Sequence, residues 1–310
     1  MSFALEVKEE IISHTFSHDQ KEALLSGFIK YNADIVYSLN YEKLKLVTIS
    51  NKIARTLFSF CKEFFDGEIQ VSIIQSQVLK KQKTFQITLI GNVTQFLQKL
   101  NIYDQNNVKI IQIREDWLKD SALVRAYIAG VFIATGSVNS PETTNYHLEV
   151  QFKEQESADY FLELTNKFGF EFKILERNNT RFVCYVKKSL MVSDFIKLID
   201  ASQAVMAFEN QRISRDVFNN INRINNIDIS NQTKALVAAE KQIKEIERIR
   251  NKKMFNQLSE KAQKLAKIRL DNPEASFSEL EYIMNEEGYK ITKSGVSNLF
   301  KSIRKLSEEI

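Results

Sequence analysis

The sequence is poor in cysteine and proline, with two of each among 310 residues. Cys61 and Cys184 lie far apart, in patterns that predict a helix and a strand, so neither a disulfide framework nor a zinc site has its ligands. We predict that both are buried free thiols, and we expect no metal site and no cofactor. With 44% hydrophobic and 26% charged residues, the composition is typical of a folded globular protein rather than a disordered one.

Long apolar runs are also missing. The first 14 residues, MSFALEVKEEIISH, carry Glu6, Glu9 and Glu10, where a secretory signal is uncharged. No later segment reaches the roughly 18 apolar residues that a membrane span needs. We therefore expect a cytoplasmic protein that does not contact the membrane.

A strong excess of one charge is absent too. The formal net charge is +4, from 43 Lys and Arg against 39 Asp and Glu. Residues 1–230 hold 27 of each sign, so the whole excess lies in residues 231–310, with 16 basic and 12 acidic side chains. The C-terminal part is therefore the candidate for binding a polyanion, although a solvated helical surface can carry the same excess.

The first two-thirds of the chain repeat one pattern of a helix, strands and a second helix. Apolar residues at helical spacing predict opening helices over 19–31 and 120–135. The interval from the glycine of each opening helix to the start of the next helix is 24 residues in both copies. This predicts an α+β fold with a duplicated module over 1–200, whose halves are about 1–105 and 118–200.

Strand patterns stop after residue 200. Residues 201–230 predict a helical connector, and residues 231–310 predict an all-α domain. Within that domain we expect helices over 231–256 and 258–271, followed by a helix-turn-helix at about 275–308. The length of the chain agrees with several domains that each bury their own core.

Both opening helices contain a similar nonapeptide, LSGFIKYNA at 25–33 and IAGVFIATG at 128–136. These resemble the LAGLIDADG signature of homing endonucleases, in which small residues allow two helices to cross closely. Glycine within a helix costs about 1 kcal/mol relative to alanine, so tight packing explains it better than helix propensity. The small residues concerned are Ser26, Gly27, Ala129 and Gly130.

The acidic position of that signature is lost in both copies. It falls on Asn32 in the first copy and on Thr135 in the second. Cleavage in that family needs two carboxylates that hold divalent cations, and an amide and a hydroxyl do not supply them. Asp34 lies two residues beyond Asn32, but the matching position in the second copy is Ser137. We therefore predict no catalytic residues and no enzymatic activity.

The C-terminal segment has clear helix boundaries. Ser276 and Glu279 have the spacing of a capping box, and Gly288 suits a left-handed helix end. Thr292 predicts the cap of a last helix with Val296, Leu299, Ile303 and Leu306 on its apolar face.

The opposite face of this last helix is polar and basic. We expect Asn298 to pair with an adenine edge, while Lys301, Arg304 and Lys305 contact phosphates. The alternative interpretation is a solvent-exposed helix that binds nothing, because such a helix also has a polar and basic face. The full set of predicted DNA-binding residues is Thr292, Lys293, Ser294, Ser297, Asn298, Lys301, Arg304 and Lys305.

Four segments resemble the WhiA family of bacterial regulators over nearly the whole chain: SFALEVKEEI, RAYIAGVFIATGSVNSPETTNYHLEVQF, FENQRISRDVFNNINRI and RLDNPEASFSELEYIMNEEGYKITKSGVSNLFKSIRKL. The resemblance implies a LAGLIDADG-like domain without nuclease activity and a C-terminal helix-turn-helix. It also implies sequence-specific binding of double-stranded DNA, association with the nucleoid and transcriptional regulation in cell division, chromosome segregation or sporulation. Other transcription or division proteins are further partners that it suggests.

Two other hypotheses stay open at this point. One is a ligand-sensing regulator whose N-terminal domain binds a small molecule. The other is a residual homing endonuclease, for which the motifs lack the carboxylate pair.

Overall fold

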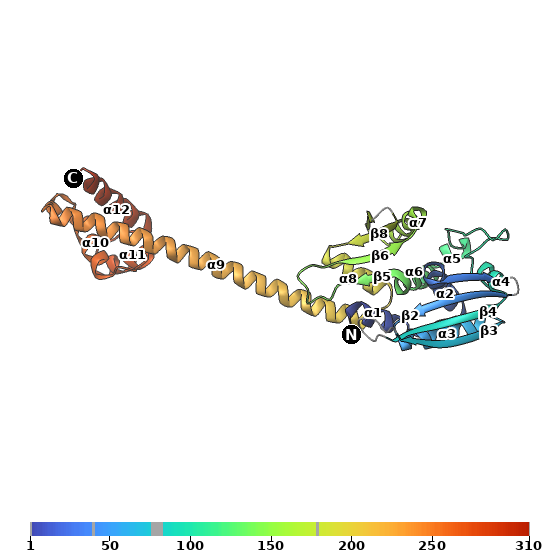
Figure 1. The fold of residues 1–310 in the computed structure, drawn as a ribbon. Helices are drawn as coiled ribbons and strands as arrows, with labels where there is room; N and C mark the ends of the chain where they lie inside the picture. The colour runs from blue at the N-terminus through green and yellow to red at the C-terminus, as the bar shows by residue number, and fades with distance from the viewer. Residues whose placement is uncertain (1, 39–40, 76–82, 178–179, 310) are drawn as a thin grey trace. The chain divides into compact units, whose positions relative to one another are not determined.

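A computed structural model describes residues 2–38, 41–75, 83–177 and 180–309 of the chain. Its contacts divide the chain into two compact units, Met1–Arg215 and Asp216–Ile310. We describe each unit by itself (Figure 1). No helix within the described ranges combines the length and the apolar character needed to cross a membrane.

The first half of the N-terminal unit contains one antiparallel sheet with the strand order β1-β2-β4-β3. The sequence pattern over 68–79 predicts a strand, which the structure shows as β3 as far as Gln75, and the remainder lies outside the described residues. The elements are α1 (Phe3–Ile11), α2 (His18–Asn32), β1 (Asp34–Ser38), β2 (Tyr41–Thr48), α3 (Asn51–Phe64), β3 (Glu68–Gln75), β4 (Lys83–Gly91) and α4 (Val93–Lys99).

The second half repeats this arrangement. Its sheet has the strand order β5-β6-β8-β7, in which the third and fourth strands are exchanged as in the first sheet. This equivalence confirms the duplicated α+β module. The elements are α5 (Glu115–Leu118), α6 (Ser121–Thr135), β5 (Gly136–Val138), β6 (Leu148–Phe152), α7 (Gln155–Asn166), β7 (Lys173–Arg177), β8 (Arg181–Val186) and α8 (Ser189–Leu198).

The two halves meet where α2 packs against α6. A Cβ atom added to Gly27 would overlap the carbonyl oxygen of Tyr127, and one added to Gly130 would overlap that of Leu24. Both helices are therefore in backbone contact at their glycines. This confirms that close packing explains the small residues of the two nonapeptides.

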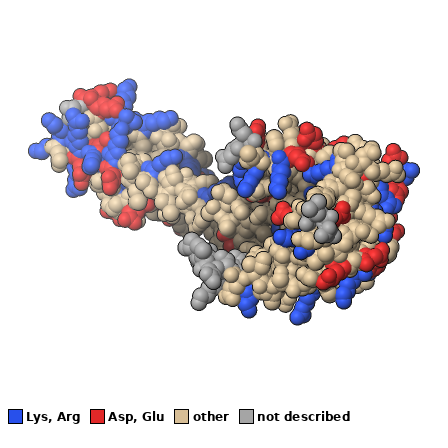
Figure 2. Space-filling view, turned by 45° about the vertical axis from the view of Figure 1, so that its right-hand side comes forward, with Lys and Arg blue, Asp and Glu red and all other residues tan. Residues whose placement is uncertain are grey.

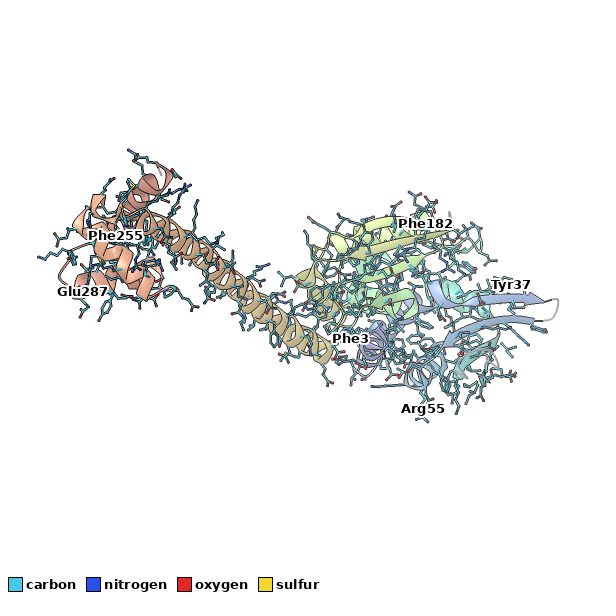
Figure 3. All side chains as sticks on the ribbon, turned by 60° about the vertical axis from the view of Figure 1, so that its left-hand side comes forward. Phe3, Tyr37, Arg55, Phe182, Phe255 and Glu287 are labelled. Atoms are coloured by element: carbon cyan, nitrogen blue, oxygen red, sulfur yellow. The ribbon has the colours of Figure 1, made fainter. Side chains whose placement is uncertain are left out.

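The core of the N-terminal unit is continuous across both halves. Phe28 on α2 and Phe132 on α6 are buried in it, and side chains from both sheets cover it, including Phe182 on β8 (Figure 3). Cys61 and Cys184 are free and buried, as predicted, and burial raises the pKa of each thiol to about 12.

The helix α9 (Ser202–Asn251) begins in the first unit and continues into the second. Near its start, Phe208 is buried and stacks on Phe3 of α1 with ring centroids 6.4 Å apart. Phe3 is labelled in Figure 3. The helix expected over 231–256 is the later part of α9, and it ends at Asn251 because Lys253 takes a left-handed conformation.

The C-terminal unit is entirely helical. Ser259 caps the helix that was expected to begin at Leu258, so the helix starts two residues later. A second hydrophobic core joins the elements of this unit, with Leu265, Leu280, Val296 and Ile303 among its buried residues. After α9 the elements are η1 (Phe255–Gln257), α10 (Glu260–Asp271), α11 (Phe277–Glu286) and α12 (Lys293–Glu308).

Candidate nucleic-acid interface

Local hydrogen bonds fix the start and end of α11. The backbone amide of Ser276 donates to the Glu279 carboxylate at 2.6 Å, and the amide of Glu279 donates to Ser276 Oγ at 3.3 Å. This is the predicted capping box. Gly288 has φ +89°, so it takes the left-handed conformation expected after a helix.

A side chain near the end of α11 holds the turn that follows. Asn285 accepts a hydrogen bond from the Ile291 amide at 3.0 Å and donates one to the Ile291 carbonyl at 2.9 Å. These paired bonds fix the path of the chain up to Thr292. The Thr292 hydroxyl then accepts from the Gly295 amide at 3.3 Å, so Thr292 is the cap of α12.

The buried face of α12 differs slightly from the predicted one. Val296 and Ile303 are buried as expected, but Phe300 and Ser307 are also buried, whereas Leu299 and Leu306 are half-buried. Phe300 stacks on Phe277 of α11 with ring centroids 5.5 Å apart. This stacking rotates α12 toward its Phe300 side, because a large aromatic ring gains more from burial than a leucine.

The opposite face of α12 is open to solvent. Ser294, Asn298, Lys301 and Lys305 are exposed, and Ser297 is half-buried. Ser294 Oγ lies 3.0 Å from the hydroxyl of Thr292, so the first turn carries two adjacent hydroxyl groups. Ser294, Asn298, Lys301 and Lys305 thus share one accessible face. Lys293 and Arg304 are exposed too, but helical spacing places them at its flank, nearer the buried side of α12.

Charge separates α12 from α11. Within the described residues, Lys293, Lys301 and Lys305 form no ion pair, and α12 has no acidic side chain before Glu308. The helix α11 carries only acidic charges, on Glu279, Glu281 and Glu286. A polyanion is therefore attracted to α12 and repelled by α11.

Arg304 differs from the three lysines. Its guanidinium donates to Glu308 at 2.9 Å and lies 3.9 Å from the carboxylate of Glu245 on α9. The hydrogen bond to Glu308 raises the pKa of Arg304. The two carboxylates therefore partly neutralise the positive charge of Arg304. The spacing in the sequence did not predict the ion pair with Glu245, which lies on another helix.

Arg269, on the last turn of α10, was not predicted from the sequence. This residue is 1% exposed, and it donates to the carbonyl oxygens of Pro273 at 3.3 Å and Ala275 at 2.6 Å. Burial lowers the pKa of its guanidinium, which also lies 5.4 Å from the Phe300 ring. Arg269 thus holds the turn between α10 and α11 by binding its carbonyl oxygens. Its position in the last turn of a helix could have predicted this, because a basic side chain there can bind the free carbonyl groups at the helix end.

The degenerate positions of the two nonapeptides make local hydrogen bonds. The side-chain oxygen of Asn32 accepts from the Val47 amide at 3.0 Å, and the Thr135 hydroxyl donates to the Val131 carbonyl at 3.3 Å. Among the described residues, no group of three or more His, Cys, Asp or Glu side chains is arranged to hold a metal ion. Both positions thus serve the backbone of their own half.

Comparison with known proteins gives matches along the whole chain. The WhiA N-terminal LAGLIDADG-like domain matches residues 18–103, the WhiA LAGLIDADG-like domain matches 124–218, and the WhiA C-terminal HTH domain matches 221–307. Relatives called "Probable cell division protein WhiA" include one from Ligilactobacillus salivarius, 32% identical over 310 residues, and one from Bacillus licheniformis, 31% identical over 310 residues. Each alignment covers 100% of this chain and 97% of the relative.

A solved structure shows the same fold. The full-length DUF199/WhiA protein from Thermatoga maritima matches with a TM-score of 0.59 and 24% identity, over 100% of this chain and 98% of that one. Together with the domain matches, this confirms two LAGLIDADG-like halves followed by a helical connector and a helix-turn-helix.

Proposed function

Because the chain belongs to the WhiA family, we propose that it is a sequence-specific DNA-binding regulator of transcription in cell division and chromosome segregation. The names of its relatives support the cellular role. The helix-turn-helix match supports DNA binding. From this we further expect a cytoplasmic protein that associates with the nucleoid and works with other transcription or division proteins.

The observation that carries this proposal is the exposed face of α12. Lys301 and Lys305 are solvent-exposed and make no ion pair within the described residues, so they are free to bind phosphates. Asn298 lies about one turn before Lys301 and about two turns before Lys305 on the same face, where its amide can pair with an adenine edge. Phosphate contacts would position the helix, and base contacts would select the sequence. Thr292, Lys293, Ser294, Ser297 and Arg304 complete the proposed interface.

We also propose that the chain is not a nuclease. Asn32 and Thr135 replace the acidic residues of the LAGLIDADG signature, and their polar atoms bond to the backbone. Restoring acids with Asn32→Asp and Thr135→Asp together should still give no magnesium-dependent cutting of supercoiled plasmid. Cutting by the unchanged protein would contradict the proposal.

We propose that the two parts of the chain fold separately and have different functions. Residues 1–200 and 231–310 would fold on their own, with 201–230 as a helical connector, and DNA affinity would lie in the C-terminal part. The separate hydrophobic cores support two folding units, and the N-terminal core extends into the connector as far as Phe208.

The test is fluorescence anisotropy with a duplex selected from random sequences by the full-length protein. Lys301→Ala and Lys305→Ala should each weaken binding to the selected duplex and to a scrambled one alike. Each should also lower the slope of log affinity against log salt by about one, since one phosphate contact releases about one counterion.

Lys261→Ala is the matched control, because Lys261 is an exposed lysine on α10, outside the proposed interface. Its affinity and salt slope should equal those of the unchanged protein. If the α12 variants behave like this control, α12 does not bind DNA and the proposal is wrong.

A further inference from the structure

The N-terminal unit contains a cavity of about 530 Å³ at the C-terminal ends of α2 and α6. Tyr31 and Thr135 line it from these helices, Tyr103 lines it from the segment after α4, and Phe152 lines it from the end of β6. A space-filling view shows a hollow in this unit with Lys and Arg side chains near its edge (Figure 2). The volume lies within the range of about 300–1,000 Å³ that is typical of small-molecule sites.

Positive charge dominates the lining of this cavity. Among the residues that the structure describes, five cationic side chains from separate elements line it, with one carboxylate, that of Glu154. The five cations are Lys8 on α1, Lys30 on α2, Lys109 after α4, Lys153 after β6 and Arg181 on β8.

The one carboxylate already has its partners. Glu154 binds Lys109 at 2.7 Å and accepts a hydrogen bond from Ser157 at 3.2 Å. Within the described residues, Lys8, Lys30, Lys153 and Arg181 form no ion pair. The cavity therefore keeps a large excess of positive charge. Proteins usually pair a buried charge with one of opposite sign.

Lys30 is the most deeply placed of these cations. It is 8% exposed, and its ammonium donates to the Ile111 carbonyl at 2.7 Å and lies 5.8 Å from the centroid of the Tyr127 ring. Burial, with a smaller contribution from the nearby Lys109, lowers the pKa of Lys30 to about 7. Burial alone lowers the pKa of Lys8 to about 8. A bound anion would supply both ammonium groups with the missing negative charge.

We propose that this cavity binds a phosphate-bearing small molecule of nucleotide size. Lysine and arginine side chains that converge from several elements would bind the phosphate oxygens. The rings of Tyr103 and Phe152 offer apolar contact to the rest of the molecule. Lys30 is 8% exposed, which favours a small anion over a duplex backbone as its partner.

This inference is separate from the proposed DNA-binding role, which depends on α12 of the other unit. The ligand site uses only residues up to Arg181. A failure of one proposal therefore leaves the other standing. If both hold, the protein is a DNA-binding regulator with its own nucleotide-type ligand.

The experiment is isothermal titration of the full-length protein with inorganic pyrophosphate, with ATP and with uncharged adenosine. We expect saturable binding of ATP and of pyrophosphate below about 1 mM, and none of adenosine. Tighter binding of ATP than of pyrophosphate would show that the aromatic lining contributes. The opposite order would overturn the nucleotide size of the proposed ligand.

Variants locate the site. Lys153→Gln with Arg181→Gln removes two exposed cations of the cavity, so folding should be unaffected, and ATP binding should weaken about tenfold or more. The matched control is Arg55→Gln with Lys62→Gln, which removes two exposed cations from α3; Arg55 is visible on that helix in Figure 3. Equal binding by both double variants would place the anion elsewhere and overturn the proposal.

Two further readouts separate the cavity from DNA binding and from surface charge. Lys301→Ala with Lys305→Ala should bind ATP as the unchanged protein does, and loss of ATP binding would assign the anion to α12 instead. At pH 8 the bound anion should raise the pKa of Lys30 and Lys8, so titrations in buffers of different ionisation enthalpy should show proton uptake. Binding without proton uptake would mean that these two lysines do not face the ligand.

Discussion

The ends of α2 and α6 and the outer face of α12 use their polar side chains in opposite ways. At Asn32 and Thr135, the polar atoms bond to backbone groups of their own half. On α12, Asn298 and Lys301 are exposed and bond to nothing within the described residues. A polar group that is already satisfied stabilises the fold, and one that is left free at the surface is available to a partner.

The same contrast applies to charge. The N-terminal unit places Lys30 in its interior without an ion pair to any described residue, so the cost of desolvating its ammonium group destabilises the folded state. The C-terminal unit keeps Lys301 and Lys305 in water, where they cost little. Variants of the two regions should therefore differ in what they change: stability and small-ligand binding in one, DNA binding in the other.

The largest expected effect is on the helix crossing. Gly130→Ala should destabilise the N-terminal unit by about 3 kcal/mol, because its methyl group meets the backbone of Leu24, which no rotamer change can relieve. Urea unfolding followed by the fluorescence of Trp117 measures this, since it is the single tryptophan of the chain and is buried in this unit.

Gly169→Ala serves as the control for the crossing. Gly169 has φ +81° and open space around its Cα, so its variant should lose only about 1 kcal/mol from backbone strain. Equal losses for the two glycines would mean that α2 and α6 are not in backbone contact.

The next effect concerns base selection by α12. Asn298→Ala should cost about 1 to 3 kcal/mol on the selected duplex and leave binding to a scrambled duplex nearly unchanged, because a base-edge pair adds discrimination and no charge. Anisotropy on both duplexes at several salt concentrations checks this. A similar loss on both duplexes would assign Asn298 to the phosphate backbone instead.

The third effect is a pH dependence confined to the N-terminal unit. The pKa of Lys30 is about 7 in the folded protein, below its ordinary 10.5, so the unfolded chain binds more protons between these values. Stability should therefore rise with pH, by up to about 1.4 kcal/mol per unit for this group. Lys109 and Glu154 are the charged groups that influence it.

Lys30→Met should reduce this rise between pH 7 and 9 and leave the part that Lys8 contributes above about pH 8, as measured by urea unfolding with Trp117 fluorescence. Lys62→Met on α3 removes an exposed lysine and should leave the slope unchanged. An unchanged slope in Lys30→Met would show that Lys30 is not desolvated in the folded protein.

The sequence predicted the features that depend on local pattern. The capping box at Ser276, the cap at Thr292 and the glycine at 288 all follow from short-range hydrogen bonds and backbone conformation. The crossing at Gly27 and Gly130 was predicted too, because glycine weakens a helix and is favoured there only where another backbone must come close.

Features that depend on distant parts of the chain were not predicted. The basic cavity joins side chains from Lys8 to Arg181, which no sequence spacing connects. The choice of Phe300 over Leu299 for the buried face depends on Phe277, which comes from another helix. The ion pair of Arg304 with Glu245 likewise depends on how α9 packs within its unit. Only the packed structure brings these groups together.

The smallest expected effect concerns Arg304 itself. Glu308→Gln should strengthen binding to both duplexes alike, by about 0.5 kcal/mol at low salt, because it removes a negative charge beside the DNA and releases the guanidinium that Glu308 binds at 2.9 Å. Glu309→Gln is the matched control, since Glu309 is exposed beside it and pairs with no cation within the described residues. The control removes the same charge, so any gain beyond it measures the release of Arg304. Equal gains for both variants in anisotropy would mean that Arg304 does not reach the phosphates, and that the lysines of α12 bind them without it.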